Sequence, residues 1–153
     1  MSPNVSRRQI LGFIGASAFA GCSGLSSSNN ETTLPILVAV ELANATDQQQ
    51  TFKFRVKRAD TLDEEPKTVT NNERTVAATS TVRITHGWAK TPGDYALEYK
   101  VGAGDWTQSN ITARLTQREQ ICYERQIQID PDEDTNSFNV TTVTNVDAPC
   151  PEE

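Results

Sequence analysis

His86 is the only histidine in the chain, and we consider it first because histidine is the commonest general base. It lies in the segment Thr85-His86-Gly87-Trp88, at the end of an expected strand. A nucleophile–histidine–acid site needs a serine or cysteine about 3 Å from the imidazole, and the sequence has no G-x-S-x-G elbow or similar motif. We therefore interpret His86 as a loop or surface residue. A single histidine also excludes multi-histidine zinc catalysis, and with Met1 as the only methionine it excludes blue-copper sites.

Three aspartates at alternate positions, Asp130, Asp132 and Asp134, have the spacing that opens a calcium-binding loop. That loop also needs a glycine where Thr135 stands and a bidentate glutamate where Thr141 stands. The sequence therefore favours a solvated acidic turn, with a weak cation site as the alternative.

Acidic pairs and tryptophans raise two further possibilities. Spacing alone does not locate a carboxylate pair for glycoside hydrolysis, so Glu64-Glu65 and Glu152-Glu153 are interpreted as solvated charges. Trp88 and Trp106 would form a sugar-stacking platform if both were exposed and coplanar, whereas the alternative is that they pack in the core or at a corner. No catalytic constellation emerges, so we predict a protein that is not an enzyme and holds no cofactor or metal.

Four segments match the N-x-S/T glycosylation sequon. Their acceptor residues are Asn30, Asn44, Asn110 and Asn139. Asn44 is the favoured candidate because it lies in an expected turn, and Asn139 is expected to point outward from the last strand.

The elements that would position these residues are strands, because apolar and polar residues alternate from residue 34 onward. The first run places five apolar residues on one face: Leu34, Ile36, Val38, Val40 and Leu42. Phe52, Phe54 and Val56 alternate with Thr51, Lys53, Arg55 and Lys57 in the clearest strand. We expect a charged loop over 60–67, a short edge strand over 68–70 and a strand within 75–85 that points Val82 and Ile84 inward.

The second half of the chain repeats this pattern. Strands are expected at four further runs: Tyr95, Leu97, Tyr99 and Val101; Ile111, Ala113 and Leu115; Ile121, Tyr123, Ile127 and Ile129; Phe138, Val140 and Thr142. Seven or eight strands without an amphipathic helix predict one all-β domain, an antiparallel β-sandwich over residues 34–147.

The segment from Trp88 to Leu97, WAKTPGDYAL, resembles the late-strand region of immunoglobulin-like domains. The resemblance implies that a turn glycine precedes Tyr95 and that the Tyr95 hydroxyl hydrogen-bonds back across a corner. Leu97 stands where those domains carry their second core cysteine. We therefore expect an immunoglobulin-like sandwich that lacks their core disulfide.

Residues 1–21 have the pattern of an export signal. The apolar and small run from Ile10 to Ala20 would span about 16 Å as a helix, against a bilayer core of about 30 Å. This length predicts a signal peptide. A buried N-terminal helix is the alternative, and the glycine and serine content of the run disfavours it.

Ser6-Arg7-Arg8-Gln9-Ile10-Leu11 resembles the twin-arginine export motif, and Phe19-Ala20-Gly21-Cys22 resembles a lipobox. The second resemblance implies cleavage before Cys22 and attachment of lipid to it, which would make the membrane a partner. A two-chain lipid anchor is stable, whereas one acyl chain binds only marginally. Residues 22–33 would then be a flexible tether, and the domain would lie at the extracellular face of the cell membrane.

The charge balance is acidic, with 14 Lys and Arg against 20 Asp and Glu. Removal of residues 1–21 takes away Arg7 and Arg8, which leaves 12 basic against 20 acidic residues and a net charge of −8. Such a charge argues against nucleic-acid binding. Acidity, few lysines and twin-arginine export together resemble secreted haloarchaeal proteins, with an ordinary acidic extracellular protein as the alternative.

If Cys22 carries lipid, Cys122 and Cys150 remain, and in an oxidising compartment such a pair predicts a disulfide. The bond would close a loop of about 28 residues and stabilise the fold by about 3 kcal/mol. A metal or redox pair is the alternative, but the C-x-x-C spacing is missing. Because Cys122 alternates with Ile121 and Tyr123, we expect the bond to pin the tail 148–153 onto an outer sheet face.

Together these observations predict a non-enzymatic, membrane-anchored lipoprotein that acts as an interaction or envelope module, with an unknown protein or glycan as partner. The alternative is an accessory ligand-binding or carbohydrate-binding lipoprotein associated with a surface or a transport system.

Overall fold

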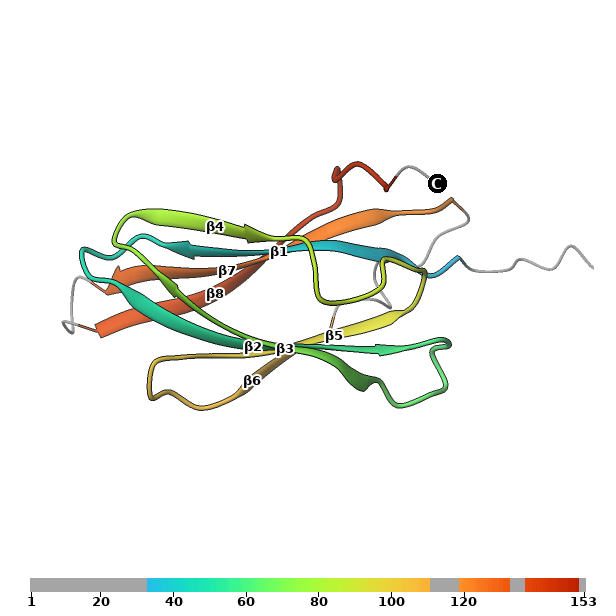
Figure 1. The fold of residues 1–153 in the computed structure, drawn as a ribbon, viewed down its shortest axis with the longest axis horizontal. Helices are drawn as coiled ribbons and strands as arrows, with labels where there is room; N and C mark the ends of the chain where they lie inside the picture. The colour runs from blue at the N-terminus through green and yellow to red at the C-terminus, as the bar shows by residue number, and fades with distance from the viewer. Residues whose placement is uncertain (1–32, 111–118, 133–136, 152–153) are drawn as a thin grey trace, which may run out of the picture.

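The computed structural model describes residues 33–110, 119–132 and 137–151, which form two four-stranded sheets packed face to face (Figure 1). The strands are β1 (Ile36–Asn44), β2 (Gln50–Ala59), β3 (Lys67–Val76), β4 (Ser80–Ile84), β5 (Asp94–Val101), β6 (Thr107–Asn110), β7 (Cys122–Asp132) and β8 (Ser137–Asn145). One sheet has the order β4-β1-β7-β8 and the other β3-β2-β5-β6. Within these described ranges, no helix is both long and apolar enough to cross a membrane. The two packed sheets confirm the prediction of an all-β sandwich.

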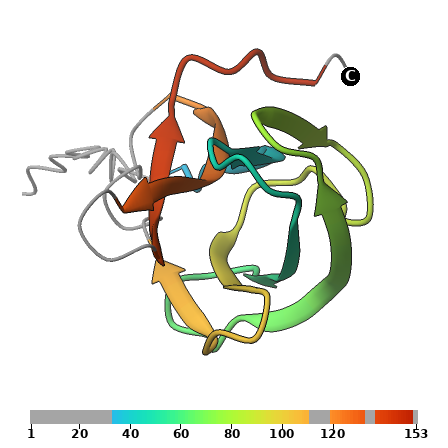
Figure 2. The same ribbon diagram turned by 90° about the vertical axis from the view of Figure 1, so that its left-hand side faces the viewer.

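Alternation of apolar and polar residues creates the core between the sheets. Phe52, Phe54 and Val56 of β2 are all 0% exposed, as their alternation predicts. The inward residues of β5 lie beside them, with Phe54 opposite Tyr99 and Val56 opposite Leu97 in the antiparallel register. Seen end-on, the two sheets curve around this core (Figure 2).

The first strand does not keep one apolar face, and this part of the prediction is wrong. A register shift between Leu37 and Ala39 changes which residues point inward. Leu37, Val40 and Leu42 lie in the main core, whereas Ile36 and Val38 belong to a separate outer cluster. β1 is buried on both faces, which explains why its sequence is a nearly continuous apolar run instead of an alternating one.

Three further expectations need correction. The pairing is not wholly antiparallel, because β1 runs parallel to β7. The edge strand expected over 68–70 is the ten-residue β3, which pairs along β2 as far as Gln50 opposite Val76. The strand expected within 75–85 is divided by a turn, in which Thr79 has a positive φ of 49°. The strand expected over 111–115 lies outside the described residues.

The corner before β5 has the predicted tyrosine geometry. The Tyr95 hydroxyl donates to the carbonyl oxygen of Thr91 at 2.6 Å and contacts that of Ala89 at 3.1 Å. Gly93 precedes it, and a Cβ at this position would lie 2.8 Å from the Ala59 carbonyl oxygen. Only glycine allows this close approach of the two backbone segments.

Replacing Tyr95 by Phe should lower the free energy of unfolding by about 1 kcal/mol at neutral pH, because the hydroxyl hydrogen bonds are lost. Burial raises the pKa of Tyr95 above its ordinary value of 10.0. The native state therefore holds the proton more tightly, so this stabilisation is complete below the unfolded pKa and is lost as pH rises through the folded pKa. Urea unfolding of Tyr95→Phe and the parent chain between pH 7 and pH 11 measures both effects. Identical alkaline losses in the two chains would contradict this expectation.

The C-terminal tail lies against the outer face of the sheet β4-β1-β7-β8, where Figure 1 shows it above the sheet. Cys122 and Cys150 form a disulfide with their Cα atoms 5.2 Å apart. Cys122 packs with Ile36, Val38 and Ala148, while Tyr123 faces the main core. The bond therefore pins the tail to an outer face, in agreement with the prediction.

One buried cation joins the two sheets. Arg125 of β7 is 4% exposed and faces inward. Its guanidinium donates to the hydroxyls of Thr142 and Thr144 on β8 and of Ser109 on β6. Burial lowers the pKa of Arg125, and the hydroxyl oxygens replace part of its lost hydration. Arg125 thus fixes β6, a four-residue edge strand, against the opposite sheet.

Candidate functional site

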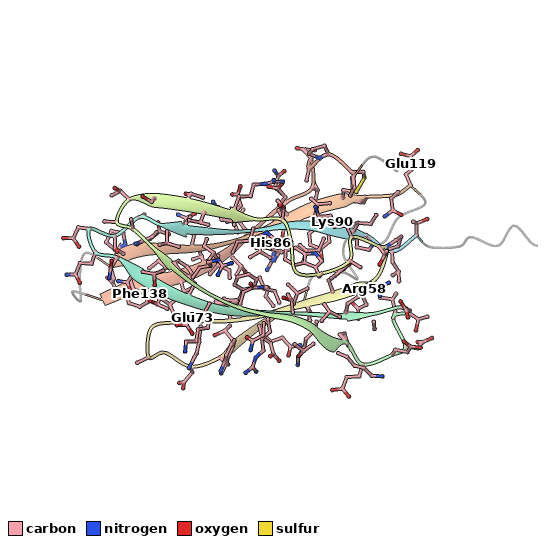
Figure 3. All side chains as sticks on the ribbon, viewed as in Figure 1. Arg58, Glu73, His86, Lys90, Glu119 and Phe138 are labelled. Carbon is pink, nitrogen blue, oxygen red and sulfur yellow. A yellow bond between two sulfur atoms is a disulfide. The ribbon has the colours of Figure 1, made fainter. Side chains whose placement is uncertain are left out.

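A polar cleft of about 390 Å³ lies on the outer surface of the sheet β3-β2-β5-β6. We call it the Trp106 cleft and define it by its seven lining residues: Lys53, Arg55, Asn71, Asn72, Glu73, Lys100 and Trp106. Figure 3 shows side chains projecting from this surface beside the labelled Glu73. Its volume lies within the range of small-ligand sites.

The strand register brings these side chains together. Lys53 lies between Glu73 of β3 and Lys100 of β5, and Arg55 lies between Asn71 and Glu98. The outward residues of β2 share one face because they alternate with the buried phenylalanines. The same alternation that builds the core therefore also builds the cleft.

The cleft carries a positive charge that its own carboxylates do not balance. Lys53 pairs with Glu73 at 3.0 Å. Arg55 lies 3.6 Å from Glu98, which Lys57 also approaches to 2.5 Å. Among the described residues, Lys100 has no carboxylate partner. Three cations and one carboxylate line the cleft, in a chain whose net charge is −6.

Trp106 forms the aromatic wall of the cleft. The turn between β5 and β6 presents it, with the Gly102 amide donating to the Thr51 carbonyl oxygen at 2.8 Å. Its ring lies 4.1 Å from the Arg55 guanidinium carbon and 5.5 Å from the Lys100 ammonium, both within cation–π range. Trp106 is nevertheless 37% exposed. Its ring is thus positioned and still accessible to a ligand.

The electrostatics of the cleft suit binding better than hydrolysis. The hydrogen bond from Lys57, opposed by partial burial and supported by Arg55, lowers the pKa of Glu98. A glycosidase general acid needs a raised pKa so that it is protonated at neutral pH. Glu98 has the opposite shift, and Glu73 is paired with Lys53. These carboxylates hold cations in place.

His86 and the described aspartates of the possible calcium loop lie outside the Trp106 cleft. His86 is exposed in the loop after β4, which agrees with its interpretation as a loop residue. Asp130 and Asp132 lie in β7 and Asp134 falls outside the described residues. Asp130 accepts a hydrogen bond from Gln128 at 2.7 Å. No group of three potential metal-ligating side chains occurs within the described parts of the chain.

The two tryptophans do not form a platform. Trp88 is 9% exposed, and its indole nitrogen donates to the Leu37 carbonyl oxygen at 2.8 Å. Trp88 belongs to the main core cluster, while Trp106 lies on the outer surface of the sheet β3-β2-β5-β6. The hypothesis of a stacking surface made by both tryptophans is therefore wrong, and only Trp106 is accessible to a ligand.

The glycosylation candidates fall into different environments. Asn44 is 2% exposed, and the amide nitrogen that would carry a glycan donates to three backbone carbonyls. Its turn-like sequence therefore does not make Asn44 an accessible glycosylation site. Asn110 and Asn139 are exposed on β6 and β8. Asn30 and the lipidation candidate Cys22 lie outside the described residues.

The sequence shows only part of the Trp106 cleft. The alternation of Lys53, Arg55 and Lys57 with buried residues signals a basic strip on β2. Lys100 and Asn71 join this strip only through strand pairing, which the sequence pattern does not specify.

The chain is a two-sheet β-sandwich with a basic cleft, lined by one aromatic residue, on one outer surface. Comparisons with protein-family models, with curated proteins and with solved structures find no match to the chain.

Proposed function

We propose that this chain is a lipid-anchored, non-enzymatic interaction module at the extracellular face of the cell membrane. The observation that carries the proposal is the Trp106 cleft, a concentration of positive charge on an otherwise acidic chain. Charge that is locally opposite to the net charge directs an anionic partner to one place and repels it elsewhere.

The placement of the chain ends supports this role. Ile36, at the start of β1, is opposite Cys122, to which the C-terminal tail is bonded. The start of β1 and the disulfide-bonded tail therefore lie at one end of the sandwich (Figure 1). The cleft lies on the outer surface of the other sheet, so an anchor on Cys22 would leave it accessible.

The anchor is tested by replacing Cys22 with Ser. The parent chain should enter the detergent-rich phase in a detergent phase-separation assay, because two or more acyl chains drive strong partition. Cys22→Ser should remain in the aqueous phase. Equal partition of both chains would refute lipidation at Cys22, and this assay does not depend on what the cleft binds.

The interaction is tested with the full chain carrying Cys22→Ser, added to isolated cell envelopes. Adding Lys100→Glu should reduce binding about tenfold, because it reverses the unpaired charge in the cleft. Lys67→Glu is the matched control, since Lys67 is an exposed lysine outside the cleft on β3. Co-sedimentation measures the bound fraction. Equal binding by the two variants would remove the cleft from the proposal.

A further inference from the structure

We infer that the Trp106 cleft binds a carboxylated sugar, a segment of an acidic envelope glycan of the uronic-acid class. This inference rests on the proposed function and names the partner of the same site. Three properties of the cleft select this ligand: its unbalanced cations, the exposed amide of Asn71 and its exposed aromatic ring.

The cations select a carboxylate. Lys100 has no acidic partner in the part of the chain that the structure describes, and it lies beside Lys53 in the strand register. Arg55 shares Glu98 with Lys57, so its guanidinium retains donors for a second anion. A ligand carboxylate between Lys100 and Arg55 would bring the charge that the cleft lacks.

The Asn71 amide selects hydroxyl groups. Asn71 is exposed and makes no side-chain hydrogen bond within the described ranges, so its donor and its acceptor are both available to a ligand. Asn72 is opposite the buried Phe54, so its side chain points to the other face of β3, where it donates to the Thr70 hydroxyl at 3.0 Å. Neighbouring donors and acceptors match a sugar, whose hydroxyls both donate and accept.

The aromatic ring distinguishes a sugar from an acidic peptide. Arg55 and Lys100 lie over the Trp106 ring, and the 37% of Trp106 that is exposed offers apolar surface beside these cations. Sugar rings present flat C–H surfaces that pack on such a ring, whereas flexible Asp and Glu side chains need only the cations. The exposure of Trp106, in contrast to the buried Trp88, therefore favours the glycan.

The test uses the full chain in detergent micelles and isothermal titration calorimetry with three probes of matched length. These are an oligogalacturonate, a neutral oligogalactan and an oligoglutamate. We expect the oligogalacturonate to bind and the other two to bind at least about tenfold more weakly. Lys100→Ala and Trp106→Ala should each weaken oligogalacturonate binding about tenfold, because each removes a central contact. Lys67→Ala, an exposed lysine outside the cleft, should leave binding unchanged.

Oligoglutamate binding as tightly as the oligogalacturonate would overturn the inference in favour of an acidic polypeptide. Equal binding of the neutral oligomer would overturn the role of charge, and no binding by any probe would overturn the ligand class. Envelope binding that still depends on Lys100 would in each of these cases leave the proposed interaction function intact. Circular dichroism of each variant shows that it is folded.

Discussion

Replacing Asn44 by Asp is expected to lower the free energy of unfolding by about 3 kcal/mol or more, since each unpaired buried polar group costs about 1–3 kcal/mol. The Asn44 amide nitrogen donates to the carbonyl oxygens of Gln48, Ala77 and Val76 at 2.7, 3.0 and 3.2 Å. A carboxylate would place an acceptor against these three acceptors. The side-chain oxygen already accepts from the Thr46 amide and hydroxyl.

The matched control is Asn110→Asp, the same chemical change at an exposed sequon. Asn110 uses its side-chain oxygen to accept from Gln108 at 3.0 Å, and a carboxylate keeps this role. Its stability should change by no more than about 0.5 kcal/mol. Urea unfolding followed by circular dichroism gives both values. Similar stabilities for the two variants would contradict the buried Asn44 network.

Loss of the disulfide has the second largest expected effect. Cys150→Ser should lower the free energy of unfolding by about 3 kcal/mol, because the unfolded chain is no longer closed over its 28-residue separation. The tail packs on an outer face, so the native sandwich should persist. The amide chemical shifts of β2 and β5 should stay unchanged, while those of residues 146–151 move toward random-coil values.

Reduction of the parent chain is the independent control, since it breaks the same bond without a substitution. Both treatments should expose Ile36 and Val38, which pack against Ala148 of the tail. Loss of native shifts throughout the domain at low temperature would contradict an outer, tail-fixing role for the bond.

The parts of the fold that the sequence predicts well are those set by neighbouring residues. Phe52, Phe54 and Val56 alternate with charged residues, and burial follows from that period of two. The Tyr95 corner depends on residues within six positions of the tyrosine, so a short motif contains its geometry. Local patterns of this kind predict both elements and contacts.

The errors concern contacts between distant segments. The bulge in β1 follows from packing Ile36 and Val38 under a tail more than 100 residues away in sequence, a distance no local pattern encodes. Asn44 has the composition of a turn residue, yet its amide reaches carbonyls 32 and 33 residues away. Alternation also does not distinguish a parallel from an antiparallel partner for β1.

The Trp106 cleft also depends on contacts between distant segments, so the sequence does not predict it. Trp88 and Trp106 both lie near glycines between strands, and only the tertiary fold buries one and exposes the other. Lys100 becomes part of a basic cleft because β5 pairs with β2 in one particular register. The sequence therefore predicts that β2 has a charged face, but not which residues complete it.

The central position of β1 has a mechanical consequence. β1 is hydrogen-bonded on both sides, to β4 in antiparallel and to β7 in parallel orientation, and it is the strand nearest to Cys22 in the chain. A pull between a membrane anchor and a ligand held on the other sheet would act along β1. Bonds to β4 and β7 would be loaded in shear, so many must break together, whereas a terminal edge strand would unzip one bond at a time. The domain is thus built to bear tension at the end where it would be tethered.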